Sequence, residues 1–161
     1  MLRTIFAAVV ILGSGTGLLA QNGSFESPDR KLRAVIIPVG GPGYETHESR
    51  VEIRTQTGRL LWQRSFASQD HNHGEGVGHA QWTLDSRFFV FNTSNSGGHQ
   101  PWHKPTYFYS IASHKLYSVD AIIGPVASDF KVDSSNALST THLSLNDNEN
   151  KSVIVRLNNW R

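Results

Sequence analysis

Apolar and polar residues alternate in short runs along most of this chain, and clusters of turn-forming residues separate the runs. Residues 50–55 (Arg-Val-Glu-Ile-Arg-Thr) alternate with a period of two, which is typical of a half-buried strand. Runs of β-branched and aromatic residues predict further strands at 32–39, 60–66, 88–91, 107–109, 141–145 and 152–157. After residue 20, no stretch of ten or more residues has an amphipathic helical period. The pattern therefore predicts an all-β fold.

The pattern of the first strands recurs 56 residues further along the chain. This offset places Asp29 on Asp85 and Leu32 on Phe88, so that turn falls on turn and strand on strand. We interpret the recurrence as a duplicated unit covering about residues 24–66 and 80–120, with a C-terminal hairpin at about 141–157. The predicted fold is a set of antiparallel sheets from two such units, packed as a sandwich or an open barrel.

Both units resemble blades of bacterial β-propellers of the TolB and WD40-like type. In those repeats a Trp-Ser-Pro-Asp-Gly-like turn precedes an inner strand, and a Thr-Gly-Lys-like turn joins two outer strands. The residues that carry the resemblance are Ser27-Pro28-Asp29-Arg30-Lys31, Thr57-Gly58-Arg59, Trp82-Thr83-Leu84-Asp85-Ser86-Arg87 and Ser113-His114-Lys115. The resemblance implies sheets that present loops at their ends, and it transfers no activity. Two units cannot close a ring of four to eight blades, so we expect a packed sheet pair, and an oligomer in which other copies of the chain complete a propeller is the alternative.

The N-terminus has the features of a secretory signal peptide. Arg3 precedes the apolar run 5–12, and small residues lead to Ala20, after which we place the cleavage site. Eight apolar residues are too few to span a bilayer, although an uncleaved anchor is the alternative. We therefore expect residues 1–20 to be removed, and residues 21–161 to form a single secreted or periplasmic domain.

Composition excludes several classes of function. The chain has no cysteine, which rules out disulfides, thiolate metal sites and a lipid-modified cysteine. Its formal net charge of +2 falls to +1 when Arg3 leaves with the leader, which is too small for a nucleic-acid-binding protein. We predict no membrane span in the mature chain.

Five of the eight histidines fall in, or directly after, two predicted loops, 67–78 and 94–105. His71 and His73 lie in the first loop and His79 directly follows it, and these three are candidate ligands for zinc or copper, with Asp70 or Glu75 nearby in sequence. The spacing matches neither the His-Glu-x-x-His signature nor the His-x-His arrangement of cupins. Surface histidines in polar loops are the simpler interpretation, and a metal-dependent hydrolase or lyase is the alternative.

The second loop suggests a binding role. Trp102 lies between Pro101 and His103 in a segment rich in glycine, so it is either an exposed contact residue or a plug for the end of the sheets. With no complete catalytic constellation in the sequence, we predict a non-enzymatic domain that binds a protein or glycan through His99, Trp102 and His103. A further alternative is an inhibitor of a secreted enzyme such as lysozyme, with the loop 97–99 inserted into the foreign active site.

Overall fold

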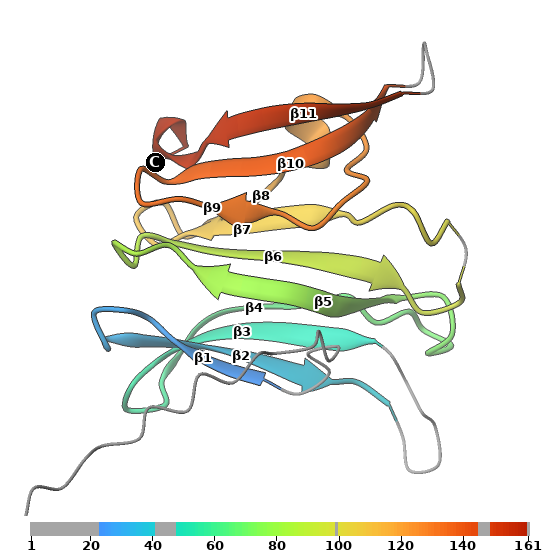
Figure 1. The fold of residues 1–161 in the computed structure, drawn as a ribbon. Helices are drawn as coiled ribbons and strands as arrows, with labels where there is room; N and C mark the ends of the chain where they lie inside the picture. Colours follow the sequence, from blue (N-terminus) through green and yellow to red (C-terminus); the bar gives the residue numbers. More distant parts are fainter. Residues whose placement is uncertain (1–22, 41–47, 99, 145–148, 161) are drawn as a thin grey trace, which may run out of the picture.

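The computed structural model describes residues 23–40, 48–98, 100–144 and 149–160 of the chain. Within these residues the fold is almost entirely β-structure, as predicted, and three antiparallel sheets lie one above another as layers of a sandwich (Figure 1). The predicted signal peptide lies outside the described residues. None of the described helices is long and apolar enough to cross a membrane.

The first two sheets have the same topology, four strands that each pair with the next in chain order. The first sheet contains β1 (Gly23–Glu26), β2 (Leu32–Pro38), β3 (Ser49–Thr55) and β4 (Leu60–Ser65). The second contains β5 (Glu75–Trp82), β6 (Phe88–Asn95), β7 (Thr106–Ser110) and β8 (Lys115–Ser118). β2 begins at residue 32 and β6 at residue 88, 56 residues later, so the offset seen in the sequence separates strands in equivalent places.

A third sheet completes the stack. It contains β9 (Lys131–Val132), β10 (Ala137–Ser144) and β11 (Glu149–Arg156), in the order β11-β10-β9. The short helix α1 (Asp120–Ile123) precedes it, and the 3-10 turn η1 (Leu157–Asn159) follows it. The predicted C-terminal hairpin is therefore confirmed, with a longer first strand, whereas β9 had no signal because residues 128–135 are mostly polar.

The second sheet is buried on both faces, which explains its aromatic strands. In β6, Phe89 and Phe91 pack toward the first sheet, and Phe88 and Val90 pack toward the third. All four side chains are at most 1% exposed, and burial of such side chains stabilises a fold by about 1.5–3 kcal/mol each. A strand that faces a core on both sides loses the polar positions of a half-buried strand.

The same turn geometry recurs at one end of all three sheets. The turns that begin at Ser27 and Thr83 each place a residue in the left-handed region, Arg30 at φ 57° and Ser86 at φ 61°. The third sheet has a shorter version that begins at Asp133 and has Asn136 at φ 62°. This third turn was missed in the sequence because it is one residue shorter and has its carboxylate at a different position.

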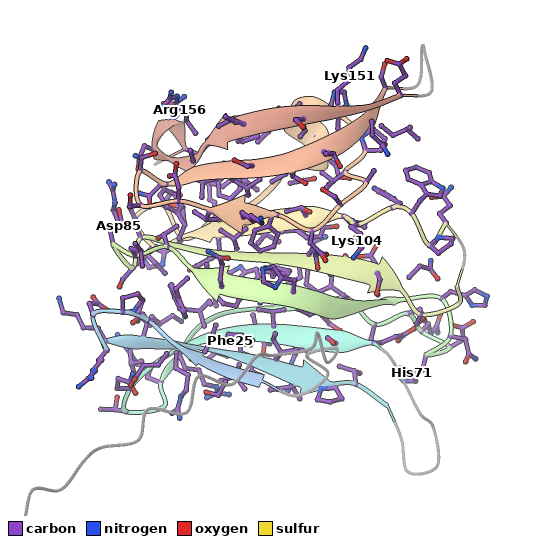
Figure 2. The ribbon with its side chains drawn as sticks, in the orientation of Figure 1. Phe25, His71, Asp85, Lys104, Lys151 and Arg156 are labelled. Atoms are coloured by element: carbon purple, nitrogen blue, oxygen red, sulfur yellow. The ribbon has the colours of Figure 1, made fainter. Side chains whose placement is uncertain are left out.

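Hydrogen bonds join each of these turns to the next. The amide of Asp29 donates to Ser86 Oγ at 3.0 Å, which links the first and second turns. Asn136 Nδ2 donates to Asp85 Oδ2 at 2.7 Å, which links the third turn to the second. The three sheets are thus fixed to one another at this end, well away from the histidine-bearing loops (Figure 2).

Two predictions about the ends of strands are wrong. Residues 23–26, where no strand was predicted, form β1, and residues 75–78, assigned to a loop, begin β5. Both segments are poor in β-forming residues and become strands because they pair with a neighbour, β1 with β2 and β5 with β6. Pairing with an existing strand overrides weak local propensity.

Candidate functional site

The loops between β4 and β5 and between β6 and β7 lie side by side at one end of the sheets. Ser96 connects them: its amide donates to the carbonyl of Gly74 at 2.9 Å, and its Oγ donates to the same oxygen at 3.0 Å. The β4–β5 loop joins the two units and the β6–β7 loop lies inside the second unit, so the 56-residue offset does not relate them, yet they emerge at the same end of the sheets (Figure 1). We call the described parts of these segments, 67–74, 96–98 and 100–105, the histidine rim.

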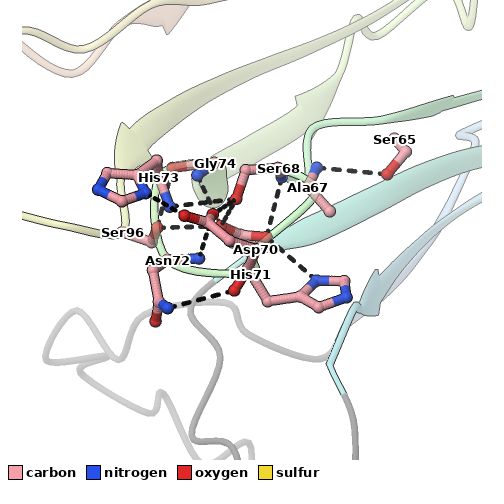
Figure 3. A network of polar contacts seen from close by, with 10 residues as sticks. Ser65, Ala67, Ser68, Asp70, His71, Asn72, His73, Gly74 and Ser96 are labelled. Atoms are coloured by element: carbon pink, nitrogen blue, oxygen red, sulfur yellow. Dashed lines mark hydrogen bonds and ion pairs between the residues drawn. The ribbon is translucent and has the colours of Figure 1, made fainter.

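Glu48, a buried carboxylate, organises the first half of the rim. Its side chain accepts hydrogen bonds from the amides of Gly74 (2.6 Å) and Ser68 (3.1 Å), and from the hydroxyls of Ser68 (2.8 Å) and Ser96 (3.2 Å). Figure 3 shows these donors converging from both loops. Burial alone would raise the pKa of Glu48, but these hydrogen bonds outweigh it and lower the pKa, so the carboxylate is ionised.

The close approach of the backbone to Glu48 requires glycine at position 74. A Cβ there would lie 2.5 Å from the carbonyl oxygen of Phe66 and 2.6 Å from the carboxyl carbon of Glu48. Any side chain would push the loop off the carboxylate. No pattern in the sequence indicates this pairing, because two strands, β3 and β4, separate Glu48 from Gly74 along the chain.

The three histidines proposed as metal ligands have three different partners. His73 Nδ1 lies 2.5 Å from Asp70 Oδ2, His71 Nδ1 lies 3.5 Å from the carboxylate of Glu48, and the ring of His79 packs 4.7 Å from that of Phe130. The described residues contain no group of three side chains placed to hold a metal ion. The three histidines thus make separate contacts, two with carboxylates and one with an aromatic ring, and the zinc or copper site stays a sequence prediction.

The second half of the rim forms one wall of a cleft. Trp102 is 41% exposed and lines this cleft of about 330 Å³ together with Ala127, Leu143 and Asn150. Leu143 and Asn150 are cross-strand partners at the end of the β10–β11 hairpin. Trp102 is therefore a partly exposed wall of a hollow between the rim and the third sheet. We call this hollow the aromatic cleft.

Asp120, at the start of α1, holds Trp102 in place by contacting two residues that follow Trp102 in the sequence, His103 and Thr106. Its Oδ1 lies 2.6 Å from His103 Nε2 and accepts a bond from the amide of Val126 at 3.2 Å. Its Oδ2 accepts a bond from the amide of Thr106 at 2.9 Å. His103, predicted to contact a ligand, thus has one ring nitrogen committed to the protein. It positions the loop that carries Trp102.

The opposite wall of the aromatic cleft is attached to the same structure. The segment 125–127 runs beside β10, where the amide of Ala127 donates to Thr141 and the amide of Leu143 donates to Pro125. On its other side, the amide of Lys104 donates to the carbonyl of Val126 at 2.9 Å. Both walls are therefore fixed by backbone hydrogen bonds before any ligand arrives.

The sequence found only part of this site. It identified Trp102 and His103 as candidates, and His99 lies outside the described residues. Sequence reasoning missed Asp120, Ala127, Leu143 and Asn150, because each belongs to a segment with no motif and reaches the cleft only through sheet packing. Among the described residues, the hydrogen-bond partner of the His103 ring is Asp120.

No family model matches the sequence, and no curated protein is significantly similar to it. The assignment of a function therefore rests on the geometry of this chain.

Proposed function

We propose that the protein is a secreted or periplasmic, non-enzymatic β domain that binds a glycan through the aromatic cleft. The observation that carries the proposal is the partly exposed Trp102 ring on the wall of a preformed hollow of about 330 Å³. Trp102 is the one aromatic residue among the large apolar side chains that are exposed in the described part of the chain.

The shape and chemistry of the cleft favour a sugar over a protein surface. Its volume is at the lower end of the range for small-molecule sites, about 300–1,000 Å³, whereas a stable protein interface buries about 800 Å² on each partner. An aromatic face packs against the C–H groups of a sugar ring, and the Asn150 amide can both donate to and accept from hydroxyl groups. Leu143 adds an apolar contact between them.

The proposal is tested by comparing the purified protein with its Trp102→Ala variant on an immobilised set of oligosaccharides. Leu84→Ala is the matched control, because Leu84 is also a large exposed apolar residue (68%) but lies in the turn at the other end of the sheets. We expect saturable binding to at least one oligosaccharide, weakened about tenfold or more by Trp102→Ala and unchanged by Leu84→Ala.

Two outcomes would contradict the proposal. Equal binding by the wild type and Trp102→Ala would remove the aromatic cleft from recognition. Absence of glycan binding, together with a purified protein partner whose affinity depends on Trp102, would favour a protein ligand instead.

A further inference from the structure

A second cleft is lined by residues of the first two sheets and of the loop that joins them, and it takes no part in the proposed glycan site. It measures about 310 Å³ and is lined by residues of β4, the loop that follows it, the start of β5 and β7, namely Arg64, Ser65, Phe66, Ala67, Ser68, His73, Gly74, Glu75 and Tyr107. We call it the arginine cleft. Its lining carries both a guanidinium and a carboxylate.

The guanidinium of Arg64 lies against aromatic rings and has no anionic partner among the described residues. Its central carbon lies 5.1 Å from the centre of the Phe66 ring and 5.7 Å from that of Tyr107. Within the described residues, the side chain of Arg64 makes no ion pair and no hydrogen bond. A planar guanidinium that is stacked but not hydrogen-bonded has its donors free for a carboxylate.

Glu75 supplies the opposite charge in the same cleft. Thr93 Oγ donates to its Oε2 at 2.6 Å, which fixes the side chain without neutralising it. Glu75 and Arg64 do not form an ion pair with each other, yet both charges act on the phenol of Tyr107. Burial, and then Glu75, raise the pKa of Tyr107 to about 12, so its hydroxyl keeps its proton and can act as a donor, and Tyr107 is one of the residues that line the cleft.

We propose that the arginine cleft binds a small zwitterion of the amino-acid or dipeptide class, with its carboxylate on Arg64 and its ammonium group on Glu75. Two opposite charges that share a cleft without pairing would gain a partner each from such a ligand. A simple anion would satisfy Arg64 alone and would be repelled by Glu75. The Tyr107 hydroxyl provides a further donor for the ligand carboxylate.

The test is a titration of the ¹⁵N-labelled protein, followed by NMR, with four probes: glycine, glycylglycine, acetate and methylammonium. We expect at least one zwitterion to bind about tenfold more tightly than either singly charged probe, with shifts centred on the Arg64 side chain and Tyr107. Arg64→Gln and Glu75→Gln should each weaken that binding about tenfold. Arg59→Gln is the matched control, since Arg59 is exposed in the turn between β3 and β4.

The remaining outcomes overturn the proposal. These are equal affinity for acetate and the zwitterions, a Glu75→Gln variant that binds as the wild type does, or no saturable shifts at all in a protein whose spectrum shows it is folded. The Trp102→Ala variant should bind the zwitterion normally, because Trp102 does not line the arginine cleft. Failure of the glycan proposal therefore leaves this one standing, and the reverse also holds.

Discussion

Replacing Glu48 by alanine should loosen the histidine rim more than any other single truncation of a charged side chain in the described residues. The carboxylate is 1% exposed and accepts four hydrogen bonds from two loops. Its removal takes away the group around which both loops are arranged.

The cost of this substitution follows from which donors have another acceptor. The Ser68 hydroxyl also lies 2.8 Å from Asp70 Oδ1, and the Ser96 hydroxyl also donates to the carbonyl of Gly74, so both can remain hydrogen-bonded. The backbone amides of Ser68 and Gly74, in contrast, have Glu48 as their hydrogen-bond acceptor and no other acceptor among the described residues. Each stranded buried amide costs about 1–3 kcal/mol, which gives about 2–6 kcal/mol in all, and entry of water into the vacated space favours the lower half of this range.

The measurement is the free energy of unfolding in urea at pH 7, together with amide hydrogen exchange at Ser68 and Gly74. We expect Glu48→Ala to lose about 2–4 kcal/mol and to lose protection at these two amides first. Glu26→Ala is the control: Glu26 is exposed and accepts one hydrogen bond, from Gln56, so the loss should stay within about 0.5 kcal/mol.

The charge of Glu48 makes the same reasoning testable by pH. Its pKa is lower in the folded protein than the ordinary value of 4.5, so the stability it contributes is fully present above pH 4.5 and is lost as the pH falls through the folded pKa. The difference between the wild type and Glu48→Gln should therefore shrink in acid. A loss below about 1 kcal/mol for Glu48→Ala at pH 7, or a difference that grows in acid, would refute the argument.

Two further substitutions test the turns and the core. Arg30 has φ 57° and no side-chain partner among the described residues, so Arg30→Gly should raise the free energy of unfolding by about 0.5–1 kcal/mol; a loss of stability would contradict the left-handed turn. Phe89→Ala should cost about 3–5 kcal/mol because Phe89 is 0% exposed between the first two sheets, whereas Ile154→Ala, at 64% exposure, should cost less than about 0.5 kcal/mol. Similar losses at both positions in urea unfolding would contradict the assigned core.

The strands with strong local patterns were predictable from the sequence. Residues 50–55 alternate because one face of β3 packs on the core and the other does not, and the 56-residue offset reflects two sheets with the same strand order. The length of an apolar run and the choice of turn residues are local properties of the sequence, so they predict strands and turns without knowledge of the tertiary structure. The resemblance to propeller blades remains an interpretation of these patterns.

The histidine rim was only half predictable. The sequence placed Trp102 and His103 in a loop, but it could not show that Asp120 would hold His103 or that Leu143 would face Trp102. These contacts join segments 17 residues apart or more, and no periodicity encodes which segments meet.

The sequence by itself determined the class of the fold, its repeated strands and the residues that form its turns, because those follow from hydrophobic period and backbone preference within a few residues. The tertiary structure alone decided that a third sheet covers β6, that Glu48 gathers two loops, and that Arg64 and Glu75 share a cleft without pairing. The physical reason is that burial and hydrogen bonding act between whichever surfaces the packed sheets bring together. Their strength depends on position in space, which a linear pattern does not contain.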